Sequence, residues 1–321
     1  MEPKKLRLAA LLLAALAAGC AGGRASFFRP DPLEHQQKLF AEGKYAQIIA
    51  ELGKSQITGL PRRQRARAYI MLARSYEFTG ADDRALQTYQ LAVGLYPKNL
   101  ELLTHLGGLL HQAGLDDRAR PHFERVVSLH PNNAAANLGL AEIHRAQGFL
   151  AKSREHYEKT LEEWAKNAAL WRDYAGLLSE QRNFVLARTA IQISLDLTGD
   201  SVETYLAYAR IERRHGLNDS AYRRLEKALA IDPADIELNL QKALWMLKDG
   251  RIEKARKLAE RMIEKFPEEP LAHWIRASTS LRMGKHAWAA ADLRAAASAE
   301  RTHPFIARTA RAMLLEMGEF Q

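Results

Sequence analysis

The sequence has one cysteine, Cys20, in 321 residues, so the chain cannot form an internal disulfide. It has few aromatic residues (8%) and no run of five or six like charges, which excludes a basic tail. Glycine and proline are few, whereas alanine and leucine are plentiful. This balance favours helices, because alanine and straight-chain residues lose little freedom in a helical backbone.

The motifs of common catalytic sites are also missing. There is no glycine-rich phosphate loop, no G-x-S-x-G elbow and no H-E-x-x-H pair. The 11 histidines are scattered, and His105 and His111 lie six residues apart, so they point in different directions from a helix. We therefore predict no catalysis, no small-molecule substrate, no cofactor and no metal site. An unrecognised enzyme remains the alternative.

The chain is basic. Its formal net charge is +9, and removal of residues 1–19, with three basic residues and one acidic residue, leaves +7. Such a charge permits contact with anionic lipid, glycan or nucleic acid without identifying any of them. Arginine and lysine are spread along the chain without aromatic stacking motifs, so we expect no nucleic-acid partner.

Residues 1–20 begin with a short basic stretch, followed by an apolar run over about 8–18. The run is shorter than the roughly 20 residues of a membrane span and is typical of a secretory signal peptide. Its end, LAAGC, resembles the lipobox of bacterial lipoproteins, with Ala17 in place of the preferred leucine. The resemblance implies cleavage before Cys20 and lipidation of its thiol. The alternative is an ordinary signal peptide with an incidental cysteine.

By the same resemblance, Ala21 after the cysteine implies sorting to the outer membrane. We therefore expect a lipid-anchored protein on the periplasmic face of the bacterial outer membrane. Residues 20–30 are expected to form a short tether.

A 34-residue period runs through most of the chain. In the first clear copy it consists of Tyr69, Leu72, Ala73, Tyr76, Gly80, Ala85, Tyr89, Ala92 and Pro97. The turn position recurs as Gly114, Gly148, Arg182, Gly216, Gly250 and Gly284. The small residue after it recurs as Ala119, Ser153, Ala187, Ala221, Ala255 and Ala289. Glycine permits a positive φ in the turn, and small residues let two helices approach closely.

This pattern resembles the tetratricopeptide repeat. The resemblance implies an all-α fold, a right-handed superhelical α-solenoid of helix-turn-helix repeats that bury each other's apolar faces. We expect seven repeats over 66–303, a divergent first helix pair over 31–65 with a loop at 59–61, and a C-terminal capping helix over 304–321.

In this family the first helix of each repeat lines a concave groove, with positions 2, 5, 9 and 12 pointing into it. Carried over to this sequence, the mapping places a set of basic residues in or beside the groove: Arg74, His111, Arg145, Arg172, Arg210, Arg213 and Arg214. The last three are spaced i, i+3 and i+4 and should share one helix face. Their guanidinium groups suit carboxylates or phosphates. The alternative is a solvated face balanced by Glu142, Asp173 and Glu180.

The mapping also predicts an apolar strip, which consists of Leu240, Leu244, Leu247, Trp274 and Leu281. In an open groove this strip is exposed, and an exposed apolar patch usually marks a site for a partner helix or extended peptide. The alternative is that chain curvature and the terminal helix bury the strip.

Together these features predict a non-enzymatic scaffold or adaptor lipoprotein. Its partners are expected to be other envelope proteins or peptides in the groove, and the membrane through lipidated Cys20. Similar repeat lipoproteins assist pilus, secretion or polysaccharide-export assembly. The alternative is an adaptor that presents substrates to a periplasmic protease or cell-wall enzyme.

Overall fold

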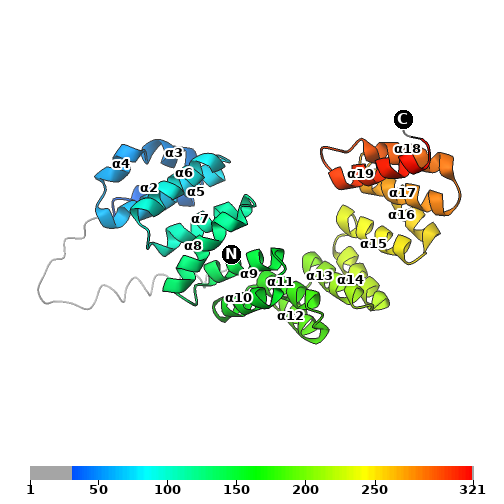
Figure 1. Cartoon of the computed structure of the whole chain (residues 1–321), viewed down its shortest axis with the longest axis horizontal. Coiled ribbons are helices and arrows are strands. Elements are labelled where there is room, and N and C mark those ends of the chain that lie inside the picture. Colours follow the sequence, from blue (N-terminus) through cyan, green and yellow to red (C-terminus); the bar gives the residue numbers. More distant parts are fainter. Residues whose placement is uncertain (1–30, 320–321) are drawn as a thin grey trace, which may run out of the picture. The chain divides into compact units, whose positions relative to one another are not determined.

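The computed structural model describes residues 31–319, which form eighteen α-helices and no β-strand (Figure 1). The all-α fold predicted from the sequence is confirmed, and the helices build an α-solenoid of antiparallel hairpins. The chain divides into two compact units, whose described residues are 31–102 and 103–319. The predicted signal peptide (1–19) and the tether (20–30) with Cys20 lie outside the described residues.

The first unit begins with three short helices where the sequence predicted a pair. They are α2 (Glu34–Ala41), α3 (Tyr45–Glu51) and α4 (Lys54–Gly59). The prediction missed a break at Gly53, whose backbone N–H donates to Gln56 Oε1 at 2.9 Å and so starts α4 as a separate helix. Two longer helices, α5 (Arg62–Phe78) and α6 (Asp82–Leu95), form the hairpin that follows.

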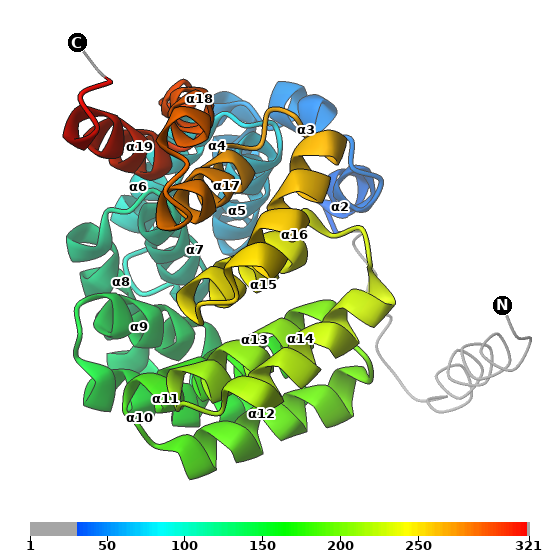
Figure 2. The ribbon, with the colours of Figure 1, turned by 90° about the vertical axis from the view of Figure 1, so that its right-hand side faces the viewer.

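The boundary between the units falls within α7 (Leu100–Gln112). The second unit continues with α8 (Asp116–Leu129), α9 (Ala134–Ala146), α10 (Leu150–Glu163), α11 (Ala168–Glu180), α12 (Phe184–Thr198), α13 (Val202–Arg214), α14 (Asn218–Ile231), α15 (Ile236–Lys248), α16 (Ile252–Lys265), α17 (Pro270–Arg282), α18 (His286–Ala297) and α19 (Pro304–Glu316). From α7 on, each first helix has 13 residues and starts 34 residues after the previous one. Consecutive hairpins of this unit lie side by side (Figure 2).

A residue with left-handed backbone conformation ends the first helix of each hairpin, as the turn glycines predicted. The φ angles lie between 71° and 80° at Gly80, Gly114, Gly148, Gly216, Gly250 and Gly284, and Gly318 ends the terminal helix α19 in the same way. The next N–H then closes the helix end; Leu115 N–H, for example, donates to Leu110 O at 2.9 Å. Arg182 takes this position with a φ of 59°, and no other non-glycine residue within 31–319 has a positive φ. Its turn is therefore strained relative to the others.

A capping residue at the end of one repeat starts the first helix of the next. The side chains of Asn99, Asn133, Asn167, Ser201 and Asp235 each accept a hydrogen bond from the backbone N–H three residues later, at 2.8 to 3.3 Å. Such a cap contributes about 1 kcal/mol, because it satisfies a donor that has no partner within the helix. These caps recur with the 34-residue period, so the sequence carries a helix-start signal as well as a turn signal.

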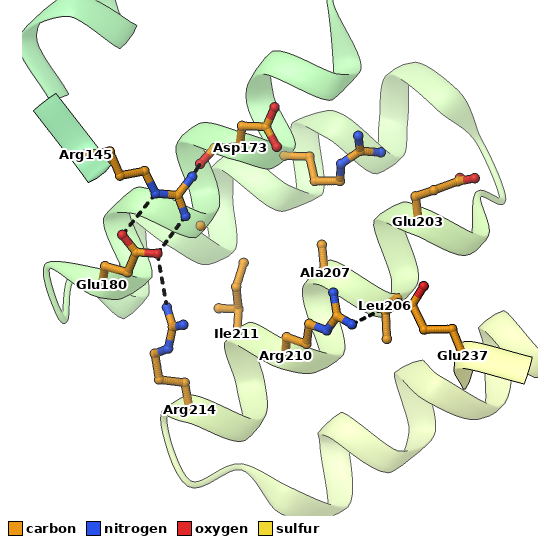
Figure 3. Close-up of a pocket in the computed structure, with 12 residues that line it drawn as sticks. Arg145, Asp173, Glu180, Glu203, Leu206, Ala207, Arg210, Ile211, Arg214 and Glu237 are labelled. Atoms are coloured by element: carbon orange, nitrogen blue, oxygen red, sulfur yellow. Dashed lines mark hydrogen bonds and ion pairs between the residues drawn. The ribbon is translucent and has the colours of Figure 1, made fainter. Parts of the chain in front are cut away.

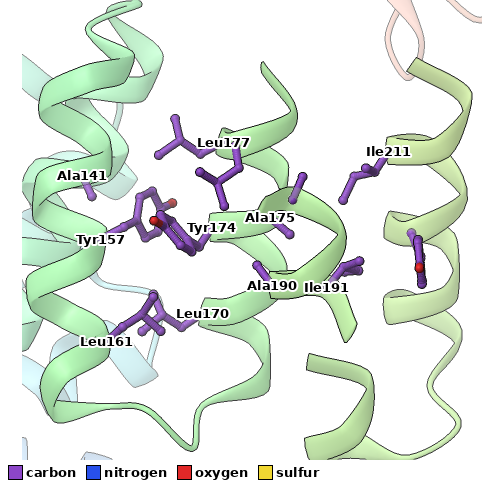
Figure 4. Packing of buried hydrophobic residues seen from close by; sticks show 13 residues of the cluster. Ala141, Tyr157, Leu161, Leu170, Tyr174, Ala175, Leu177, Ala190, Ile191 and Ile211 are labelled. Carbon is purple, nitrogen blue, oxygen red and sulfur yellow. The ribbon is translucent and has the colours of Figure 1, made fainter. Parts of the chain in front are cut away.

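The apolar core runs between the two helices of each hairpin and on to the next hairpin. The small residue after each turn is fully buried, at Ala85, Ala119, Ser153, Ala187, Ala221, Ala255 and Ala289. Figure 4 shows the core over α9–α13, where Tyr157, Leu170 and Ile191 lie among the alanines. Small side chains at the closest approach leave room for these large neighbours.

One close contact couples three helices of the second unit. The Phe123 ring on α8 is 2% exposed and lies against Gly107 on α7 and Gly139 on α9. A methyl group on Gly139 would come within 2.4 Å of the ring, and one on Gly107 within 2.9 Å. Both glycines are thus needed for the ring to pack.

We expect Gly139→Ala to lower the free energy of unfolding by about 1–3 kcal/mol, because the added methyl group overpacks the core against Phe123. Gly108→Ala is the matched control, since a methyl group there meets nothing within 4 Å. The control should raise stability by about 0.5–1 kcal/mol through helix propensity. Urea unfolding followed by circular dichroism measures both. Equal effects of the two substitutions would show that the ring contact does not limit stability.

Candidate partner-binding groove

A cavity of about 420 Å³ lies over four first helices of the second unit, α9, α11, α13 and α15 (Figure 3). We call it the arginine–carboxylate groove. Its charged lining residues are Arg145, Arg172, Asp173, Glu180, Glu203, Arg210, Arg214 and Glu237, and its apolar floor includes Leu206, Ala207 and Ile211. Four cations and four carboxylates therefore share one recess, because equivalent positions of successive first helices lie side by side.

The firmest ion pair in the groove joins Arg145 and Glu180. Arg145 Nη2 lies 2.6 Å from Glu180 Oε1, and Nε lies 3.0 Å from Oε2, so the guanidinium binds both oxygens. About 30% of each side chain is exposed. The hydrogen bonds to Glu180 raise the pKa of Arg145. This two-point geometry holds both side chains in fixed positions.

Two further arginines make weaker or more exposed pairs. Arg210 Nη2 donates to Glu237 Oε1 at 2.7 Å, with half or more of each side chain exposed. Arg214 Nη1 lies 4.0 Å from Glu180 Oε1. Solvent screens such pairs, so each contributes little to stability.

Arg172 and Asp173 have no such partners. Within residues 31–319, neither the guanidinium of Arg172 nor the carboxylate of Asp173 makes a hydrogen bond or ion pair. Burial raises the pKa of Asp173, although Arg172 and Arg145 oppose the shift. The groove thus holds one cation and one half-buried anion whose polar atoms are open to a ligand of opposite charge.

The structure brings Arg145, Arg172, Arg210 and Arg214 together in the groove, but it places Arg213 elsewhere. Arg213 forms an ion pair with Asp249 at the end of α15, and its guanidinium lies 5.3 Å from the Trp245 ring. The prediction that these three arginines share one face was therefore wrong for Arg213. Arg145 occupies the equivalent position two repeats earlier and lines the groove, so the ion pair with Asp249, and not the position on the helix, keeps Arg213 out of it.

The two remaining basic residues of the prediction lie outside this groove. His111 contacts Asp116 at 2.6 Å and Glu142 at 3.2 Å. Arg74 belongs to the first unit, where its guanidinium lies 4.7 Å from the Phe40 ring. Both side chains are held by neighbours within their own unit.

The predicted apolar strip is largely buried. Leu240 is 5% exposed and Leu247 is 4% exposed, so the expectation of an exposed strip was wrong for both. Ile275 on α17 and the apolar side of α16 cover them, whereas the alternative had assigned this burial to chain curvature and the terminal helix. Leu244 and Trp274 are half-buried against the same cluster, and Leu281 is half-buried against the cluster that includes α19.

A smaller opening of about 310 Å³ remains beside this cluster, between Leu240, Leu244, Leu271 and Ile306. Nearby on α17, Trp274 Nε1 and Ser278 Oγ are buried without a hydrogen-bond partner. The sequence pattern did not predict these two unpartnered atoms, because hydrophobic periodicity does not indicate whether an indole N–H has an acceptor.

Residues 31–319 include no cluster of three or more histidine, cysteine or acidic side chains that could hold a metal ion. No helix among them is long and apolar enough to cross a membrane.

Comparison with known proteins identifies the repeats. Models described as tetratricopeptide repeat match residues 66–99, 112–168 and 213–278. No curated protein matches the sequence significantly.

Solved structures share the fold. A tetratricopeptide repeat protein from Parabacteroides merdae is similar with a TM-score of 0.64 at 19% identity, over 78% of this chain and 98% of that one. A chain of the APC/C hetero-tetramer Cut9–Hcn1 is similar with a TM-score of 0.57 at 14% identity, over 76% of this chain and 48% of that one. Pseudomonas aeruginosa PilF gives 0.50 at 17% identity, over 67% and 97%. At these identities the likeness shows the fold alone.

Asp173→Asn should stabilise the free protein, because it removes a half-buried carboxylate without a partner. The raised folded-state pKa means that ionisation opposes folding, so the gain is full above that pKa. It should shrink as the pH falls and vanish below the unfolded value of 3.8. Thermal unfolding at about pH 7.5 and about pH 4.5 tests this dependence. Asp196→Asn, at an exposed position on α12, is the control and should show no such gain.

Proposed function

Because the chain belongs to the tetratricopeptide-repeat family, whose members are generally non-catalytic scaffolds, we propose that it is a protein-binding lipoprotein of the bacterial envelope. Its partner binds in the arginine–carboxylate groove, and lipidated Cys20 anchors it on the periplasmic face of the outer membrane. It carries out no reaction of its own.

The proposal rests on Arg172 and Asp173, two charged side chains without an internal partner in the described part of the chain. Both line the groove beside the Arg145–Glu180 ion pair. A partner segment with a carboxylate and a basic side chain satisfies both open groups at once. The Arg145–Glu180 pair holds the recess in shape while the partner binds, which lowers the ordering cost of association. The apolar floor at Leu206 and Ile211 then buries the partner's apolar atoms.

The envelope location rests on the sequence LAAGC and on the signal peptide before it. We propose assembly of a pilus, secretion or polysaccharide-export complex as the task, because similar repeat lipoproteins assist such assemblies. Co-purification with a secretin or export porin supports this task. Co-purification with a hydrolase instead supports an adaptor for a protease or cell-wall enzyme.

Affinity capture from detergent-solubilised envelopes tests the groove. Arg172→Gln combined with Asp173→Asn should weaken capture of the main partner by about tenfold or more, since each substitution removes a charge that the partner meets in a partly desolvated site. The fold should persist, because neither side chain has a partner within residues 31–319.

The control for capture is Arg261→Gln with Glu264→Gln, two exposed residues on the second helix α16. It changes the same number of charges away from the groove and should leave capture unchanged. Equal capture by all three proteins would exclude the arginine–carboxylate groove as the binding site.

Cys20→Ala tests the anchor. The variant should leave the membrane fraction, because no acyl chain can be attached. The fractionation is done at about 0.5 M salt, which screens electrostatic adsorption to lipid. A variant that still sediments with membranes at this salt concentration would show that lipidation does not hold the protein there.

A further inference from the structure

Four arginines crowd the start of α5 in the first unit. They are Arg62, Arg63, Arg65 and Arg67, and the first turn of this helix contains no acidic residue. Arg62 and Arg63 are exposed and make no hydrogen bond or ion pair with any residue of 31–319. A helix N-terminus is the positive end of the macrodipole, where cations are unfavourable. The stability of α5 therefore does not account for this cluster.

The same place is where the tether joins the fold. Asp31 is the first described residue, and its carboxylate accepts hydrogen bonds from Gln64 Nε2 at 3.2 Å and Arg67 Nη1 at 3.0 Å. It also accepts from Gln37 Nε2 at 2.9 Å. These bonds hold residue 31 against the first turns of α5, beside Arg62 and Arg63.

The tether limits how far this surface can be from the lipid. Cys20 and Asp31 are separated by 11 residue steps, and an extended chain spans at most roughly 3.3–3.6 Å per residue, or about 40 Å. With Cys20 lipidated, as the proposed function has it, the start of α5 stays within that reach of the headgroups. Direct hydrogen bonds hold two parts of the described chain to residue 31, the start of α5 and the start of α2.

We propose that Arg62 and Arg63 form a surface that binds anionic phospholipid headgroups, while Arg67 holds Asp31 beside it. Arginine suits this ligand because its guanidinium pairs with phosphate through two hydrogen bonds and stays charged at any physiological pH. Arg65 has a different role, since its Nε donates to Leu60 O at 2.8 Å and shapes the turn before α5. The acyl anchor supplies affinity, and the arginine surface fixes which side of the first unit faces the bilayer.

The test uses the processed chain from residue 20 with Cys20→Ser, so that no acyl chain is present. It is sedimented with vesicles of phosphatidylglycerol and phosphatidylcholine, and with vesicles of phosphatidylcholine alone. Each arginine near an anionic surface changes partitioning by about fivefold. Arg62→Gln with Arg63→Gln should therefore lower partitioning to the anionic vesicles by about 25-fold. The fold should not change, because neither side chain has a partner.

Arg223→Gln with Arg261→Gln is the matched control. It removes the same charge from exposed positions on α14 and α16 and should lower partitioning less than twofold. An equal loss in this control would overturn the proposal, because the protein's overall charge would then explain adsorption. Equal binding to both kinds of vesicle would also overturn it and would leave an acidic protein as the alternative partner of the cluster.

These outcomes are separable from those of the proposed function. The vesicle test contains no acyl chain and no partner protein, so a failure there leaves the capture and Cys20→Ala results intact. Binding to anionic vesicles that Arg62→Gln with Arg63→Gln removes and the control keeps supports the arginine surface, even if the Cys20→Ala protein stays with membranes at high salt.

Discussion

The structure depends on close packing of small residues against rings and branched side chains between neighbouring helices. Phe123 shows this constraint directly, since its ring lies between a glycine of its own hairpin, Gly107, and a glycine of the next, Gly139. The ring is nearly fully buried only because both neighbours lack a side chain. Each hairpin of the second unit thus depends on its neighbour, and the groove exists because this stacking sets successive first helices side by side.

Features of the fold that are decided within a single hairpin could be predicted from the sequence. The 34-residue period, the positive φ at the turn glycines and the burial of Ala119 and its equivalents are each decided within one hairpin or one contact. Arg182 shows how strongly the register is set, because it adopts the turn conformation that glycine takes in the other hairpins. Asn183 stabilises this turn, since its backbone N–H donates to Leu178 O and its side chain caps α12. The break at Gly53 escaped prediction because it falls where the period itself is lost.

The site was less predictable, for a geometric reason. The period tells which helices are neighbours, but the pairing of long side chains depends on where their ends reach. Arg145 meets Glu180, 35 residues on, whereas Arg213 meets Asp249, 36 residues on and outside the groove. A difference of one residue in the position of the partner, about 100° of helix, thus separates a groove arginine from a half-buried structural one. Burial of Leu240 likewise depends on α16 and α17, which a pattern within α15 does not report.

Pairing within the groove also limits what its arginines can contribute to binding. A carboxylate that approached Arg145 would have to displace Glu180, so the exchange gains little free energy and leaves Glu180 in need of a new partner. Arg172 and Asp173 carry no such cost, because neither gives up an internal bond. Discrimination among partners therefore falls to the two open groups, whereas the paired residues hold the helices that present them. Since the groove spans α9 to α15, a bound partner connects four hairpins that otherwise contact only their neighbours, and it should stabilise that part of the array as a single unit.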